Sequence, residues 1–264
     1  MYYKIHYSCL SHIGNVRSIN QDNFICDGRY MNMSDIPIEF PLCGTKISQD
    51  ISVFGIFDGM GGEECGEIAS YIASKAASDI EIGKDVIADL SKFCHKANND
   101  ICDYATMHEI STMGTTAAML VFAEKEVVLC NIGDSKIFRL CKGTLEQISV
   151  DHVAVAAFGV KPPLSQNLGI PPSELVIDPY FARCSYNDGD VYLICSDGLT
   201  DMVTNEEISK VLTSTGVLNK AIEILLEKAL TNGGRDNITI VLCKIERDLR
   251  WLSNLKRFIH KRGV

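Results

Sequence analysis

The chain has 264 residues, and its 46% hydrophobic and 22% charged residues are the ordinary composition of a globular protein with a sizeable core. Its formal net charge of −9 disfavours nucleic acid as the main ligand, because binding to a phosphate backbone depends on positive charge. No apolar run reaches the roughly 20 residues of a membrane-spanning helix, and no basic-then-apolar leader opens the chain. We therefore expect a cytoplasmic protein, and a monomer.

The eleven cysteines are scattered singly, without a CxxC pair. Their odd number argues against a closed disulfide framework. Several lie inside apolar runs, where a reduced cysteine behaves as a small hydrophobic residue. We expect core thiols rather than a metal or redox site.

Apolar periodicity predicts helices and strands that occur in groups. The expected helices cover residues 62–82, 85–107, 205–212 and 218–230. The expected strands cover residues 115–122, 127–131, 136–141, 145–149, 190–195 and 237–243. The close spacing of the first four strands indicates hairpins, and the grouping favours one α+β domain over a regular βαβ alternation. Residues 27–50 read as an irregular insertion or hairpin, and residues 155–179, with five prolines, read as a surface loop.

Acidic residues stand where apolar strands begin or end. The runs VFGIFD, VLCNIGD and VYLICSD end at Asp58, Asp134 and Asp197, and Asp236 precedes the strand in GGRDNITIVL. The end of one antiparallel strand and the start of its neighbour lie at the same edge, so we expect the four carboxylates to meet. Crowded carboxylates repel one another, and hard divalent cations such as Mg²⁺ or Mn²⁺ relieve that repulsion.

Simpler interpretations exist for each motif taken alone. An Asp-Gly pair after a strand is usually a turn. The glycines next to Asp58 (Gly59, Gly61 and Gly62) resemble a dinucleotide loop, but the run GMGGEECG lacks a GxGxxG spacing and no parallel βαβ unit follows. Four such acids in one chain favour a metal site, to which a glycine carbonyl could contribute.

Seven segments share the order and spacing of a known family. They are SHIGNVRSINQDNF, FGIFDGMGGEECGEIAS, MGTTAAML, NIGDSKIFRL, LEQISVDH, SDGLTDMV and GGRDNITIVL, which span residues 11–242. Together they resemble the metal-dependent protein phosphatases of the type 2C, or PPM, family in its bacterial form. The resemblance implies a four-layer α-β-β-α sandwich of two antiparallel sheets flanked by helices, formed by residues 1–246, with a metal site in a cleft at one end.

The resemblance also implies two core Mn²⁺ or Mg²⁺ ions and a third, weaker one. The implied metal ligands are Asp22, Asp58, Gly59, Asp134, Asp197 and Asp236. Asp58 would bridge the core ions, the Gly59 carbonyl, Asp197 and Asp236 would complete the first site, and Asp22 would act through a metal-bound water. Asp134, together with Asp197, matches the third position.

The implied reaction is hydrolysis of phosphoserine and phosphothreonine in proteins, the substrates of a cognate kinase, by a metal-bridging hydroxide. Arg17 matches the family's phosphate-binding arginine, whose fork can hold two phosphate oxygens. The implied catalytic residues are therefore Arg17, Asp58, Asp197 and Asp236. A phosphatase for a partner-switching transcription regulator is an alternative, and a pseudophosphatase that only binds partners is disfavoured by the retained acids and Arg17.

The sequence departs from the family at the expected site. His12 stands where many relatives have an acid, Gln21 replaces a glutamate, and Met60 occupies the position of a histidine general acid. Residues 155–179 are short for the flap of bacterial members, which leaves substrate selection open. Asn237 is expected to orient Asp236 rather than to bind metal.

The C-terminal segment lies beyond the family motifs. Residues 246–264 contain six Lys or Arg and two acids, a charge of +4. We expect residues 247–264 to form a basic amphipathic helix, with Trp251, Leu255 and Phe258 among its apolar face. Packing on the same domain is the expected role, and docking to an anionic membrane or an acidic partner is the alternative.

Overall fold

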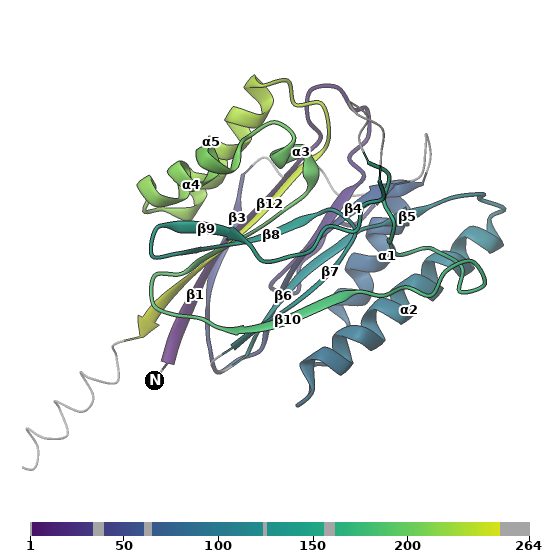
Figure 1. The fold of residues 1–264 in the computed structure, drawn as a ribbon, viewed down its shortest axis with the longest axis horizontal. Helices are drawn as coiled ribbons and strands as arrows, with labels where there is room; N and C mark the ends of the chain where they lie inside the picture. Colours follow the sequence, from purple (N-terminus) through teal and green to yellow (C-terminus); the bar gives the residue numbers. More distant parts are fainter. Residues whose placement is uncertain (1, 34–39, 61–64, 124–125, 156–161, 249–264) are drawn as a thin grey trace, which may run out of the picture.

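The computed structural model describes residues 2–33, 40–60, 65–123, 126–155 and 162–248. Two six-stranded sheets pack face to face, and helices cover both outer faces (Figure 1). All strand pairings between named strands are antiparallel in these residues. The four-layer α-β-β-α sandwich predicted from the sequence is confirmed.

The first sheet contains both ends of the described chain. In spatial order its strands are β3 (Leu42–Ile47), β1 (Tyr2–His12), β12 (Ile238–Asp248), β11 (Val191–Cys195), β8 (Lys136–Cys141) and β9 (Thr144–Gln147). β1 and β12 pair along their whole length, from Tyr2 opposite Asp248 to His12 opposite Ile238. β12 therefore continues two residues beyond the domain limit expected at residue 246, and the expected tail helix at 249–264 lies outside the described residues.

The second sheet carries the middle of the chain. Its strands are β10 (Tyr180–Ser185), β7 (Glu126–Ile132), β6 (Ala117–Ala123), β4 (Ser52–Met60) and β2 (Asp22–Cys26), with the short β5 (Gly114–Thr115) paired to β4. β4 and β7 flank β6 and both pair with it antiparallel, so β4 and β7 run in the same direction. Their C-terminal ends consequently lie at one edge of this sheet.

The helices are divided between the two outer faces. They are α1 (Gly66–Ser78), α2 (Val86–Met107), α3 (Asp197–Thr200), α4 (Asn205–Ser214) and α5 (Leu218–Thr231). α1 and α2 pack on the second sheet, whereas the other three pack on the first. Asp85 caps α2, and Thr204 with Glu207 forms a capping box on α4, which satisfies first-turn amides. Among the described residues, no helix is long and apolar enough to cross a membrane.

Alternation along the strands fills the core between the sheets. In β2, Phe24 packs between the two sheets, whereas Ile25 packs under α1 and α2. In β4, Phe54 and Ile56 belong to the inter-sheet core, whereas Phe57 faces the helices. Because side chains alternate with a period of two, positions 22 and 58 continue the inter-sheet rows. Two acidic side chains are thus placed at the end of an apolar core.

The sequence predictions fail for strands whose pairing partners lie far away in the sequence. β1, β2 and β10 were not predicted, and β3 lies within the segment expected to be irregular or a hairpin. β1 mixes polar and apolar residues, and it becomes a central strand only through its pairing with β12 at the other end of the chain. α1 ends at Ser78 instead of residue 82, and residues 62–64 of that expected helix lie outside the described part.

The segment 155–179 is more than a surface loop. Leu168 is fully buried, and its backbone exchanges two hydrogen bonds with Thr115 at the start of the second sheet. Asn98 on α2 accepts from the backbone amides of Gly169 and Ile170. The proline-rich segment is therefore anchored to the domain at its middle, although residues 156–161 are outside the described part.

Phe122 provides a test of the inter-sheet core. It is fully buried and its ring contacts the rings of Phe54, Tyr186 and Tyr192. Phe122→Ala should lower the free energy of unfolding by about 3–5 kcal/mol, because transfer and cavity costs add. Urea denaturation measures this loss. Phe40→Ala, at a side chain that is 76% exposed, is the control and should change stability by less than about 0.5 kcal/mol; similar losses in both would contradict the packing described.

Candidate active site

A cleft of about 260 Å³ opens at the end of the sandwich and brings together all four predicted acids. Asp58, Asp134, Asp197 and Asp236 line it, together with Arg17. Asp58 is the third residue from the end of β4, and Asp134 follows β7 by two residues. Asp197 begins α3 directly after β11, and Asp236 precedes β12.

The acids come from both sheets rather than from one edge of one sheet. Asp58 and Asp134 belong to the second sheet, on strands that run in the same direction. Asp197 and Asp236 belong to the first, at the end of β11 and the start of its antiparallel neighbour β12. The expectation of a single shared edge was wrong in this respect. Stacking of the two sheets joins two edges into one cleft.

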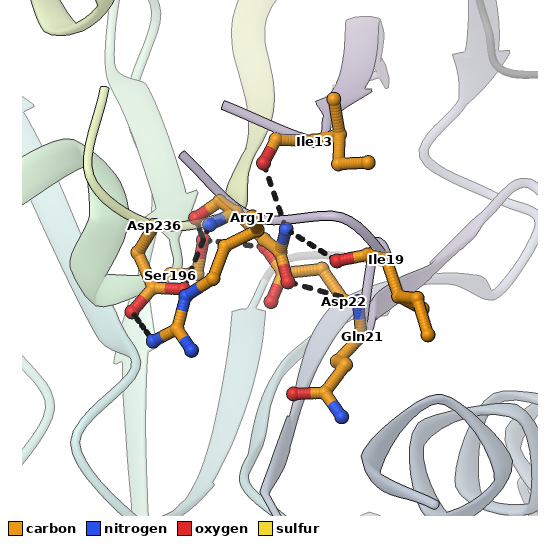
Figure 2. A network of polar contacts seen from close by, with 8 residues as sticks. Ile13, Arg17, Ile19, Gln21, Asp22, Ser196 and Asp236 are labelled. Atoms are coloured by element: carbon orange, nitrogen blue, oxygen red, sulfur yellow. Dashed lines mark hydrogen bonds and ion pairs between the residues drawn. The ribbon is translucent and has the colours of Figure 1, made fainter. Parts of the chain in front are cut away.

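Asp22 lies behind the cleft and ties the two sheets together. It stands directly opposite Asp58 in the β2–β4 register. Its Oδ2 atom accepts hydrogen bonds from the hydroxyls of Ser196 (2.8 Å) and Thr239 (2.7 Å), which come from the first sheet's side (Figure 2 shows Asp22 and Ser196). Its Oδ1 atom is buried and has no hydrogen-bond partner among the described residues. A buried acceptor without a partner is costly unless a water or a cation reaches it.

The carboxylates raise one another's pKa. Loss of water raises the pKa of Asp22 to about 7, with further contributions from Asp197 and Asp236, against hydrogen bonds from Thr239 and Ser196 that lower it. Loss of water and the charges of Asp22, Asp197, Asp134 and Asp236 also hold the pKa of Asp58 well above its ordinary range. A divalent cation in the cleft would reverse both effects.

The donor set suits a hydrated oxygen site. Within the described residues, no group of three or more His, Cys, Asp or Glu side chains is arranged so that it could hold a metal ion by itself. Mg²⁺ and Mn²⁺ commonly keep several waters and take few carboxylates. The unpartnered Asp22 oxygen, the crowded acids and the backbone of Gly59 therefore fit ions held partly through water and a carbonyl oxygen.

Gly59 lies where no side chain fits. A Cβ atom on Gly59 would come within 2.1 Å of the Gly66 carbonyl oxygen and 2.4 Å of the Gln21 carbonyl oxygen. Its amide donates to the Gln21 carbonyl at 3.0 Å, which fixes the strand end next to the cleft. The close approach explains glycine here; Gly61 and Gly62 lie outside the described residues.

Thr115, the last residue of β5, and Thr116, just before β6, connect the segments that carry two of the acids. The Asp58 amide donates to the Thr116 hydroxyl (3.0 Å), and the Thr116 amide donates to the Asp58 carbonyl (2.9 Å). The same hydroxyl lies 2.7 Å from that of Ser135, the residue after Asp134. The Thr115 hydroxyl also donates to the Asp58 carbonyl. The segments around both acids are thus held by the short stretch between β5 and β6.

Arg17 lies on the loop between β1 and β2 and points to Asp236. Its Nη2 atom is 2.7 Å from Asp236 Oδ2, and the guanidinium side chain is half exposed (Figure 2). This hydrogen bond raises the pKa of Arg17, as do the charges of Asp236, Asp58 and Asp197. A permanent, half-exposed positive charge therefore stands at the rim of the acidic cleft.

The sequence analysis missed the residues that hold the acids. Ser196, Thr239 and Thr116 are buried polar residues at strand ends that otherwise read as apolar. Their position in such runs was the available signal. Asn237 does contact Asp236, as expected, but only through its own backbone amide (2.9 Å); its side chain binds the loop of Arg17.

The chain belongs to the protein phosphatase 2C family: residues 42–231 match the family described as "Protein phosphatase 2C". The serine/threonine phosphatase Stp of Listeria monocytogenes is 29% identical over 258 residues, which cover 89% of this chain and 93% of that protein. PstP of Mycobacterium tuberculosis is 32% identical over 207 residues, 73% of this chain and 40% of that protein.

Solved structures share the same architecture. The crystal structure of M. tuberculosis PstP/Ppp superposes with a TM-score of 0.76 at 27% identity and covers 92% of this chain and 100% of that one. The catalytic domain of PstP in complex with two manganese ions gives a TM-score of 0.75 at 27% identity, covering 93% and 100%. A relative with this fold thus binds two manganese ions.

The raised pKa of Asp22 predicts a pH-dependent stability for the metal-free protein. The Asp22 carboxyl titrates at about 7 in the folded state, against an ordinary value of 3.8. Between these values the unfolded chain binds fewer protons than the folded one, so stability falls as pH rises. Asp22→Asn keeps an acceptor for Ser196 and Thr239 but cannot ionise, and it should therefore lose less stability over that window.

Urea denaturation in the presence of a chelator, at about pH 5 and about pH 7.5, measures the difference. The free energy of unfolding of the wild type should fall across this interval by an amount on the order of kcal/mol, because one pKa unit corresponds to about 1.4 kcal/mol. Equal pH slopes in the wild type and Asp22→Asn would show that Asp22 does not carry the effect.

Proposed function

We propose that this chain is a serine/threonine protein phosphatase that hydrolyses phosphoserine and phosphothreonine with Mn²⁺ or Mg²⁺ in the acidic cleft. The observation that carries the proposal is the convergence of Asp58, Asp134, Asp197 and Asp236, with Arg17 at the rim, on a protein phosphatase 2C fold. The phosphatases Stp and PstP among its relatives, and the two manganese ions bound by PstP, support it.

The residues proposed to hold the core ions are Asp58, Asp197, Asp236 and the Gly59 carbonyl. Asp22, whose Oδ1 atom is buried without a partner, is proposed to act through water. Asp134 is proposed to hold a third, weaker ion together with Asp197. Such ions supply charge to neutralise phosphate oxygens and lower the pKa of water.

Arg17 is proposed to orient the phosphate. A guanidinium can hold two phosphate oxygens in a fixed plane, and the side chain of Arg17 lines the cleft and is half exposed. Met60, at the same rim, has no proton to donate, so this position supplies no general acid. Burial raises the pKa of Cys195, next to the site, and its thiol remains protonated and unsuited to nucleophilic attack.

We further propose that the protein acts in the cytoplasm on the substrates of a serine/threonine kinase. All eleven cysteines are free thiols, and Cys94 and Cys130 lie 3.4 Å apart without a disulfide. Free thiols are usual where glutathione and thioredoxin keep proteins reduced. A role as an inactive binding protein is disfavoured, because the four acids predicted from strand ends and Arg17 all line the cleft.

Asp58 gives the direct test of the proposed reaction. Asp58→Asn removes one anionic charge at the centre of the cleft while conserving shape, and kcat should fall at least about 100-fold. Hydrolysis of p-nitrophenyl phosphate and of a phosphothreonine peptide, with Mn²⁺ and with a chelator, measures the loss. Asp188→Asn is the control and should keep wild-type turnover. Asp188 accepts a hydrogen bond from the backbone amide of Arg247, which lies at the opposite end of β12 from the cleft. Near-normal turnover in folded Asp58→Asn would rule out the proposal.

Asp134 tests the division between core ions and a third ion. Asp134→Ala should retain two tightly bound Mn²⁺ ions in a calorimetric titration, yet lose turnover of a phosphorylated protein, because the third ion would contribute to substrate turnover and not to the core. Melting temperature and circular dichroism establish that the variant is folded. Loss of all Mn²⁺ binding in a folded Asp134→Ala protein would place Asp134 in the core site instead.

A further inference from the structure

The loop that carries Arg17 is closed by one buried side chain. Residues 13–21, here called the arginine loop, connect β1 to β2 without belonging to a helix or strand. Asn237, which is 4% exposed, stands beneath it at the entry to β12. Its Nδ2 atom donates to the carbonyls of Ile13 (2.9 Å) and Ile19 (3.0 Å), and its Oδ1 atom accepts from the Gln21 amide (2.8 Å). Figure 2 shows the three loop residues around this point.

These three hydrogen bonds fix the orientation of the amide and use both of its donors. The reversed amide would place its oxygen against two carbonyl oxygens and its NH₂ against an N–H. Ile13 and Ile19 lie near opposite ends of the loop, and a single NH₂ group holds both. Asn237 therefore ties the two ends of the loop together, which reduces the conformations open to the residues between them.

The side chains between the two ends are largely exposed. Val16 is 68% exposed and the side chain of Arg17 is half exposed. Between the ends, Asn15 is also anchored, through its backbone amide to the Gly234 carbonyl and through its side chain to the carbonyls of Leu230 and Gly233. A long flexible side chain loses rotamer entropy when it binds a ligand, and an ordered backbone lowers the remaining cost. Ordering of the loop backbone thus bears directly on how well Arg17 can hold an anion.

The same residue adjoins Asp236. The Asn237 backbone amide donates to Asp236 Oδ1 (2.9 Å), while Asp236 Oδ2 receives Arg17. Gly14 packs so closely on this segment that a Cβ would lie 2.2 Å from the Asp236 carbonyl oxygen. The arginine loop and the Asp236–Asn237 segment therefore behave as one packed unit.

We propose that Asn237 is a positioning residue for phosphate recognition: its side chain closes the arginine loop and holds Arg17 at the cleft. This proposal rests on the proposed function, because it assigns a role within the same site. It differs from the expected role of Asn237, the orientation of Asp236, because the side chain serves the loop and only the backbone amide serves the carboxylate.

The test compares phosphate affinity with metal affinity. Asn237→Ala should raise the inhibition constant of inorganic phosphate about ten-fold, or about 1.4 kcal/mol, with Mn²⁺ affinity by calorimetry unchanged. In an Arg17→Ala background, Asn237→Ala should have almost no further effect on the inhibition constant, because both substitutions remove the same function. A full ten-fold effect in that background, an unchanged inhibition constant, or a parallel loss of Mn²⁺ affinity would overturn the proposal.

Asn98→Ala is the matched control for lost stability. Asn98 is also buried, at 3% exposure, and its side chain also makes three hydrogen bonds to a loop backbone, at Gly169 and Ile170. It should lower the melting temperature similarly and leave the phosphate inhibition constant unchanged. Asn237→Ser, which cannot reach both carbonyls, replaces Asn237→Ala if the alanine variant does not fold.

Hydrogen exchange separates this proposal from the proposed function. Asn237→Ala should accelerate amide exchange across residues 14–21, whereas Asn98→Ala should accelerate it near residues 169–170. This readout needs no turnover. If the wild type hydrolysed no phosphomonoester, the proposed function would be wrong, but hydrogen exchange would still test whether Asn237 orders the loop. Unchanged exchange at residues 14–21 in Asn237→Ala would overturn the positioning role.

Discussion

Like charges buried at the end of an apolar sandwich are the constraint on which the site depends. Asp22 and Asp58 continue the alternating rows that place Phe24 and Ile56 between the sheets, so hydrophobic packing itself brings two carboxylates opposite each other. Loss of water and mutual repulsion raise the pKa of both. A site of this kind gains stability when a cation enters, and metal affinity and folding free energy are therefore linked.

Neutral polar groups hold the backbones of the acids. Thr116 bonds to the backbone of Asp58 and contacts the hydroxyl after Asp134, and Ser196 and Thr239 hold one oxygen of Asp22. Hydroxyls and amides give directional bonds without adding charge to a cleft that is already acidic. The result is a preorganised set of proposed oxygen ligands on strand ends, which is the arrangement that a hydrolytic metal site requires.

The side of the cleft that is proposed to bind phosphate is built differently. The acids stand at the ends of strands and of a helix, whereas Arg17 stands within the loop that connects β1 to β2. Asp236 joins the two parts, since it is both a proposed metal ligand and the partner of Arg17 at 2.7 Å. In the proposed site, metal binding and phosphate binding would thus be electrostatically coupled through one carboxylate, and Asn237 is proposed to keep the loop close enough for that coupling to operate.

Local sequence patterns were enough to predict the positions of Asp58, Asp134, Asp197 and Asp236. Each stands at the end or the start of an apolar strand, and such a strand can be recognised from a few consecutive residues. The same holds for α2, α4 and α5. The pairing of β1 with β12, the division of the acids between two sheets and the partners of Asp22 could not. Those depend on contacts across 174 and 217 residues of chain, as in Ser196 to Asp22 and Thr239 to Asp22. No local pattern encodes such distances, so only the packing of the two sheets made these residues neighbours.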